Sequence, residues 1–136
     1  MDDHSEFSGP HRQLTEAIIG IFYEVSNELG HGFVETVYRR AMCMALQDAG
    51  IQAEEEVALP VFFRGRCVGT FHADLVVNQI ILLELKVAEE IAKPFEAQLL
   101  HYLRSSTIEI GFVMAFGQRA KFKRIIMTND RKRLPT

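Results

Sequence analysis

Charged residues interrupt apolar strand sequence near the middle of the chain. The apolar run 80–83 leads directly into Glu84-Leu85-Lys86, and Asp74 lies between two apolar neighbours. A run that is apolar on both faces is typical of a central strand covered by helices, where a charged group is buried only if it is paired or binds a metal. Strand residues two apart share a face, so Glu84 and Lys86 point the same way. Two acids and a lysine at strand ends could hold a divalent cation and activate a water; the alternative is a Glu–Lys pair on an exposed sheet face.

The bulk composition indicates one soluble globular domain. The chain has 136 residues, of which 48% are hydrophobic and 24% charged. No apolar run approaches the ~20 residues of a membrane-spanning helix, and the acidic, polar N-terminus does not resemble a secretory signal. Cys43 and Cys67 lack the spacing of a zinc site or a disulfide framework. We therefore expect reduced thiols in a cytoplasmic protein with no membrane partner.

Positive charge is concentrated near the C-terminus of a chain whose net charge is −3. Residues 119–136 contain seven basic residues and one acid. This stretch could form a phosphate-binding edge, and a solvated strand and tail is the alternative. The candidate nucleic-acid contacts are Arg119, Lys121, Lys123 and Arg124.

Hydrophobic periodicity predicts two helices in the first third of the chain. Apolar residues recur at three- and four-residue steps from 14 to 29, and Gly30 ends this helix. A second helix is predicted from Glu35 to Ala49 and is closed by Gly50. Residues 1–11 lack periodicity and are predicted to be a flexible tail.

The remaining sequence is typical of strands with one further helix. The predicted strands are 57–63, 67–77, 80–87, 108–116 and 122–127, and a helix from Pro94 to Arg104 precedes the fourth. Pro60 indicates an edge strand or a bulge. The order α-α-β-β-β-α-β-β predicts an α/β fold with a mixed central sheet, an antiparallel three-strand meander and a right-handed parallel crossover. We expect one domain over 12–128, followed by a basic tail, 129–136.

The length of one loop decides whether the two strand acids meet. A two-residue loop at Asn78-Gln79 places Asp74 opposite Leu83, with the carboxylates of Asp74 and Glu84 on opposite faces. A three-residue loop, or a bulge that adds one residue, pairs Asp74 with Glu84 directly. A metal site therefore requires the odd loop or the bulge.

Three helical residues are further candidates. Glu35 begins the second helix, where a favourable interaction with the helix dipole is a sufficient structural role. Gln98 and Tyr102 are four apart and share one face of the third helix. Their amide and phenol could orient Lys86 and touch a phosphate, and a half-buried helix surface is the alternative.

Five motifs occur in a fixed order and at compatible spacing. They are Gly32-x-x-Glu35-x-x-Tyr38, Ala73-Asp74-Leu75-Val76-Val77, Glu84-Leu85-Lys86, Gln98-Leu99-Leu100-His101-Tyr102 and Gly111-Phe112-Val113-Met114-Ala115-Phe116-Gly117. Over about residues 14–127 the chain resembles the GxxExxY protein family, which is placed in the PD-(D/E)XK nuclease superfamily. The resemblance implies a restriction-endonuclease-like core.

The resemblance also implies a role for each site residue. Asp74 and Glu84 match the metal-binding acids of the second and third core strands, and Lys86 matches the motif lysine. The Leu85 carbonyl would complete the protein ligands of Mg²⁺ or Mn²⁺. Glu35 matches the acid of the helix, and the pair Gln98 and Tyr102 matches the Gln-x-x-x-Tyr element of exonuclease-like branches. Ala73 stands where the superfamily name has proline.

The function implied is metal-dependent hydrolysis of DNA phosphodiester bonds without strong sequence specificity, with RNA open as a substrate. The alternative is a catalytically silent subunit that binds nucleic acid or another protein, because fold does not fix function. Dimerisation through an edge strand in the segment 121–126 also stays open.

Overall fold

The computed structural model describes residues 11–133, and the predicted N-terminal tail lies outside these residues except for His11. The elements are α1 (Arg12–Leu29), α2 (Glu35–Asp48), β1 (Ala53–Phe63), β2 (Arg66–Val77), β3 (Ile81–Lys86), α3 (Lys93–Ser105), β4 (Ile110–Ala115), β5 (Lys121–Ile126) and a 3-10 helix, η2 (Asn129–Arg131). The predicted order of helices and strands is confirmed. No helix within the described residues is long and apolar enough to cross a membrane.

The five strands form one mixed sheet in the order β1-β2-β3-β4-β5. The meander from β1 to β3 is antiparallel, β3 and β4 are parallel, and β5 runs antiparallel to β4. Pro60 lies in β1, an edge strand, as predicted. The other edge is β5, whose use in dimerisation stays a prediction.

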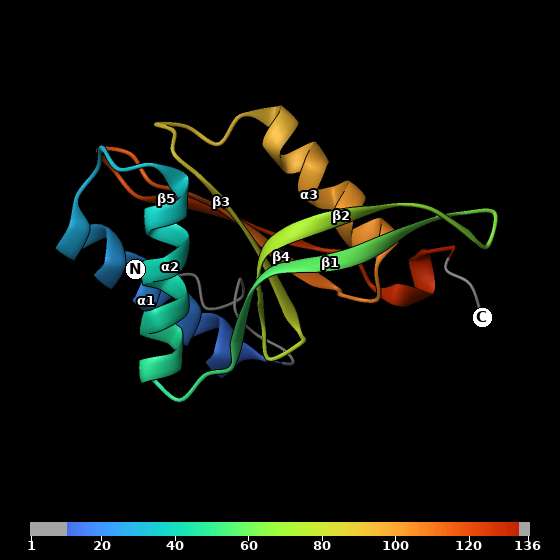
Figure 1. Cartoon of the computed structure of the whole chain (residues 1–136), viewed down its shortest axis with the longest axis horizontal. Helices are drawn as coiled ribbons and strands as arrows, with labels where there is room; N and C mark the ends of the chain where they lie inside the picture. The colour runs from blue at the N-terminus through green and yellow to red at the C-terminus, as the bar shows by residue number, and fades with distance from the viewer. Residues whose placement is uncertain (1–10, 134–136) are drawn as a thin grey trace.

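Helices cover both faces of the sheet (Figure 1). The core between the sheet and the first two helices includes Phe22 of α1, Tyr38 of α2 and Leu83 of β3. A second core, which includes Leu82 and Leu99, lies between the sheet and α3. Adjacent strand residues point to opposite faces, so β3 is apolar on both sides because helices lie on both sides.

Tyr38, the last residue of the first motif, has a structural role. Its hydroxyl donates a hydrogen bond to the Gly30 carbonyl at 2.6 Å, and its ring stacks on Phe116 with 4.2 Å between ring centroids. The first contact ties α2 to the end of α1, where Gly30 adopts a positive φ of 71°. The second packs α2 against the sheet, so both contacts help to fix the position of Glu35.

Much of β2 extends beyond the central sheet. β2 pairs with β3 only over residues 75–77, whereas its pairing with β1 continues to the hairpin turn. Residues 57–73 therefore form a two-stranded arm that curves past the C-terminal end of α3 (Figure 1). Phe71 of the arm stacks on Tyr102 of α3, with ring centroids 3.9 Å apart and the rings 5° from parallel.

The arm leaves the sheet at a sharp twist in β2. Leu75 packs with the first core, whereas Ala73, two residues earlier, packs with the second. Regular strand residues two apart would share a face. Opposite this point Glu56 has a φ of 50°, which is strained for a residue with a side chain, and the β1–β2 pairing skips the Glu56–Asp74 pair. Asp74 thus lies at the twist.

Replacement of Gly111 by alanine should destabilise the fold. A Cβ atom at this β4 position would lie 2.7 Å from Leu99 Cδ1, inside the core beneath α3. Overpacking of this kind costs about 1–3 kcal/mol, which chemical denaturation will measure. Gly69→Ala in β2 is the matched control, because nothing lies within 4 Å of its added Cβ. Equal stability of the two variants would contradict the tight approach of α3 to β4.

Candidate metal-binding and catalytic site

The loop between β2 and β3 has three residues. Val77 pairs with Ile81, so the connection comprises Asn78, Gln79 and Ile80. Both Asn78 and Gln79 have positive φ, 51° and 59°, which closes the turn. The register of this hairpin sets Asp74 opposite Glu84, one step beyond the last paired residues. The odd loop that a metal site requires is therefore present.

Asp74 and Glu84 interact where β2 and β3 separate. The Leu85 amide donates a hydrogen bond to Asp74 Oδ2 at 2.7 Å, and the Asp74 amide donates one to Glu84 Oε1 at 3.3 Å. Since the N–H and C=O of a strand residue point to the same side, the Leu85 carbonyl faces the same gap. Two carboxylates and one carbonyl thus converge on one point in the sheet.

The environment of this pair disfavours a second negative charge. Only 5% of Glu84 is exposed. Burial, together with the charge of Asp74, raises the pKa of Glu84 to about 8, against the opposing effects of the Asp74 amide and Lys86. Two like charges in a buried site require a bound cation or a shared proton to offset them. The pair is therefore chemically suited to hold a cation.

Lys86 lies beside the pair and is held by α3. It is two residues after Glu84 on β3 and so projects from the same face of the strand. Its Nζ donates a hydrogen bond to Gln98 Oε1 at 3.2 Å and lies 5.0 Å from the centre of the Phe95 ring. The structure therefore brings Asp74, Glu84, Lys86 and Gln98 together.

Tyr102 is one turn further along α3. Burial and the charges of Glu84 and Asp74 raise the pKa of its hydroxyl, and a hydrogen bond with the Gln98 side chain opposes this effect. The phenol is therefore within electrostatic range of the carboxylates. Its ring is occupied by the stack with Phe71 of the arm, and a catalytic role for its hydroxyl stays a prediction.

Glu35 approaches the site from the other side of the sheet. Burial and the charge of Asp74 raise its pKa, whereas Lys86 and Arg39 lower it. Within the described residues no hydrogen bond or ion pair joins Glu35 to Asp74, Glu84 or Lys86. No cluster of three or more Asp, Glu, His or Cys side chains suited to a metal occurs there either. The candidate ligand set is thus two carboxylates and a carbonyl.

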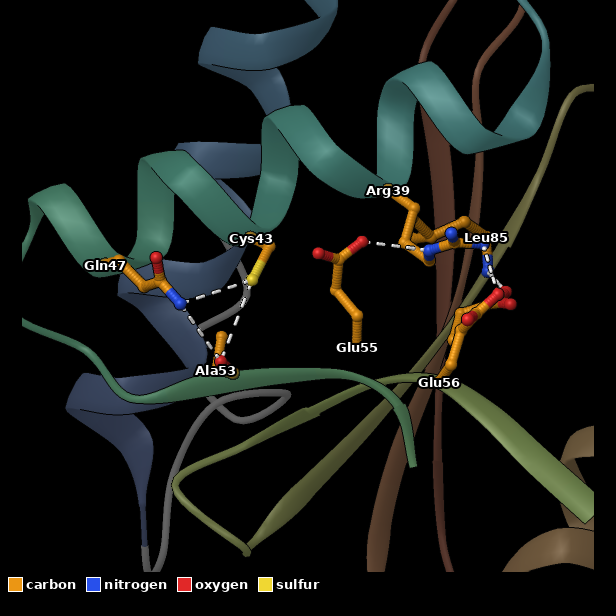
Figure 2. Close-up of polar contacts among 8 residues, drawn as sticks. Arg39, Cys43, Gln47, Ala53, Glu55, Glu56 and Leu85 are labelled. Atoms are coloured by element: carbon orange, nitrogen blue, oxygen red, sulfur yellow. Dashed lines mark hydrogen bonds and ion pairs between the residues drawn. The ribbon is translucent and has the colours of Figure 1, made fainter. Parts of the chain in front are cut away.

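Arg39 is a neighbour of the site that the sequence motifs do not include. Its guanidinium contacts Glu55 at 3.0 Å and Glu56 at 3.2 Å, both on β1 (Figure 2). These ion pairs fasten α2 to β1 at the twist opposite Asp74. The sequence feature that comes closest to indicating these ion pairs is the run of three acids at 54–56. Such a run more often forms a solvent-exposed face.

The basic candidates near β5 are partly neutralised inside the protein. Lys121 pairs with Glu90, and Lys123 pairs with Glu96 at 3.2 Å. Arg124 also interacts within the protein, and Arg119 is exposed. Any nucleic acid at this edge would compete with acidic side chains for the two lysines.

Comparison with known proteins identifies the superfamily. The family model described as "PD-(D/E)XK nuclease superfamily" matches residues 12–125, and the chain belongs to this superfamily. Its α/β architecture is the restriction-endonuclease-like fold. Among solved structures, the one titled "Crystal structure of SSO0001" is similar, with 18% sequence identity and a TM-score of 0.49. The match covers 87% of this chain and 59% of the chain in that structure. No curated protein matches the sequence.

Proposed function

We propose that this protein is a metal-dependent nuclease that hydrolyses DNA phosphodiester bonds without strong sequence specificity. One observation carries the proposal: the Asp74 and Glu84 carboxylates converge in the gap beside the Leu85 amide, next to a lysine held by Gln98. Membership of a nuclease superfamily supports it. Within that superfamily the five motifs favour the GxxExxY family.

The donors in the gap fit a small hard cation. Mg²⁺ is commonly bound by one or two carboxylates, keeps several waters and prefers oxygen ligands, and Mn²⁺ accepts similar donors. Asp74, Glu84 and the Leu85 carbonyl would supply such donors. The positive charge would also offset the burial and the repulsion from Asp74 that together raise the pKa of Glu84.

Each side chain then has a defined task. When bound, the ion supplies Lewis acidity and lowers the pKa of a water molecule. Lys86 positions the attacking water and stabilises negative charge on the phosphate, and Gln98 holds the lysine for this role. Glu35 and Tyr102 would orient groups around the pair, where burial and the nearby carboxylates raise their pKa values.

Substrate recognition would depend on the phosphate backbone. We propose that Arg119, Lys121, Lys123 and Arg124 contact phosphates. On binding, Lys121 and Lys123 would leave their ion pairs with Glu90 and Glu96 and contact the nucleic acid instead. Backbone contacts fix the position of a substrate but carry no sequence information directly. Two unpaired cysteines are compatible with the reducing cytoplasm, which we propose as the location.

A nuclease assay tests the proposal. Wild-type protein should cleave DNA in Mg²⁺ or Mn²⁺ and not in excess chelator, with single-stranded, duplex and branched DNA and RNA compared as substrates. Asp74→Asn should lower the rate by at least about 100-fold, because it weakens the metal site and the stabilisation of charge. Asp48→Asn, at the exposed end of α2, is the control and should retain wild-type activity. Equal trace activity in all three proteins would favour a silent binding subunit instead.

A further inference from the structure

A basic pocket lies beyond the end of α3, away from the candidate active site. It has a volume of about 790 Å³ and is formed by the tip of the arm, the end of α3 and the segment around η2. Its lining includes five basic residues and an aromatic residue: Arg64, Arg104, Arg131, Lys132, Arg133 and Phe63. In Figure 1 the arm reaches over this region from β1 and β2.

The C-terminal wall of this pocket is held in place by hydrogen bonds. Lys132 Nζ donates to the carbonyls of Ser106 and Ile108, at 2.9 and 2.7 Å. Three residues earlier, the Asn129 amide donates to Glu109 Oε2 at 2.7 Å. These contacts fasten the segment after β5 to the connection between α3 and β4. Arg131 and Arg133 are exposed and flank the anchored lysine, so their backbone is held at the edge of the pocket.

The pocket arginines are not paired with acids within the described residues, and Lys132 has Glu109 as an acidic neighbour. Within the described residues no salt bridge involves Arg64, Arg104, Arg131 or Arg133, and no acid lines the pocket. The lysines near β5, in contrast, both pair with acids. Guanidinium groups bind phosphates with matched geometry, so a ligand with several phosphates would offset the repulsion among these arginines.

An exposed aromatic ring adds a second kind of contact. Phe63 is 58% exposed, and the Arg64 guanidinium lies 4.9 Å from the centre of its ring. Exposed aromatic rings beside cations bind unpaired bases by stacking, whereas the bases of a duplex are already stacked on each other. The combination favours a single strand over a duplex.

The pocket is within reach of a strand that enters the candidate active site. Gln98, which contacts Lys86, and Arg104, which lines the pocket, are six residues apart on α3, a rise of about 9 Å. Along β2, eight residues separate Asp74 from Arg66 at the hairpin turn, about 26 Å. At the rise of about 3.4 Å per nucleotide of a stacked strand, these lengths correspond to roughly three to eight nucleotides, and an extended strand would need fewer.

We propose that this pocket binds a single-stranded segment of the nucleic acid substrate about three to eight nucleotides from the bond that is cut. Arg104, Arg131 and Arg133 contact its phosphates, and a base stacks on Phe63. The location of the cut rests on the proposed function, whereas binding in the pocket does not require cleavage.

The test is a binding titration without divalent ions, using fluorescent oligothymidylate of about 15 nucleotides and a duplex of the same length. Phe63→Ala, Arg104→Ala and Arg133→Ala should each weaken binding of the single strand by about fivefold or more. Each arginine variant should reduce the salt slope by about 0.7, and Phe63→Ala should leave it unchanged. Arg12→Ala is the control, since it removes an exposed cation from α1, on the opposite face of the sheet from α3.

Wild-type binding by all three pocket variants would overturn the proposal, and so would an equal loss of affinity for the duplex and the single strand. A cleavage assay on the same proteins separates this inference from the proposed function. Pocket-dependent binding without any cleavage supports the pocket and rejects the nuclease. If the protein cleaves DNA but the three substitutions leave KM unchanged, the proposed role of the pocket is rejected and the nuclease function is not.

Discussion

Replacement of Lys86 by alanine is expected to lower the rate of metal-dependent DNA cleavage by about 10²- to 10⁴-fold. The ammonium group lies beside the carboxylates of Asp74 and Glu84 and is held by Gln98 at 3.2 Å. Its loss removes both the positioning of water and a charge near the phosphate. The effect should fall on kcat more than on KM, because charge develops on the phosphate in the transition state. Steady-state kinetics on single-stranded DNA will measure it.

Lys93→Ala is the matched control for this variant. Lys93 is an exposed lysine at the start of α3, and its substitution removes the same charge. The Lys86 variant should still fold, because its hydrogen bond with Gln98 is exposed and even a hydrogen bond to a charged group contributes only about 1.5–3 kcal/mol. Equal activity of the two variants would remove Lys86 from the catalytic mechanism.

Replacement of Glu84 by glutamine should abolish stabilisation of the fold by Mg²⁺. A ligand that binds only the native state raises stability by about 1.4 kcal/mol at ten times its Kd, which corresponds to roughly 3–6 °C in Tm for a domain of this size. Glutamine has the shape of the neutral carboxyl form that burial favours, so the metal-free fold should persist. Thermal melts with and without Mg²⁺ will measure the shift.

Glu54→Gln provides the comparison, because it removes an exposed acid from β1 in the same part of the sheet. This variant should keep the full Mg²⁺-dependent shift. An unchanged shift in the Glu84 variant would mean that the ion binds elsewhere or only weakly, and Asp74 and Glu84 would lose their proposed role as ligands.

The sequence predicted the order of elements because each one has its own periodicity or turn residues. The amphipathic pattern of α1 and the bounds of β4 and β5 agree with the structure to within about two residues, the usual uncertainty of element ends. The hairpin register was not predictable in this way. β3 is apolar on both faces, so no pattern distinguished a loop of two residues from one of three. Nothing in the sequence indicated that Gln79 would adopt a positive φ.

The candidate site was predicted where its residues are close in sequence or share one helix face. Glu84 and Lys86 are neighbours on one strand, and Gln98 reaches Lys86 from α3. The contacts that were not predicted depend on tertiary packing. Arg39 meets β1 only because α2 crosses it, at residues that precede the predicted start of this strand at residue 57. The two strands of the arm were predicted, but their course over Tyr102 was not.

The basic pocket was missed for the same reason. It joins three segments that are distant in sequence, and each contributes only one to three cations. The C-terminal part was predicted to be a tail, and its division from the domain at residue 128 stays a prediction. Within the described residues, however, η2 and Lys132 are hydrogen-bonded to the connection between α3 and β4.

The most direct measurement is a crystal structure of the protein soaked in Mn²⁺, with data collected for anomalous scattering from manganese. We expect one strong anomalous peak between the carboxylates of Asp74 and Glu84, within coordination distance of the Leu85 carbonyl. The peak should be absent from crystals of Glu84→Gln. Fully soaked wild-type crystals with no peak in this gap, or with manganese bound only elsewhere, would contradict a metal-dependent nuclease site at Asp74 and Glu84.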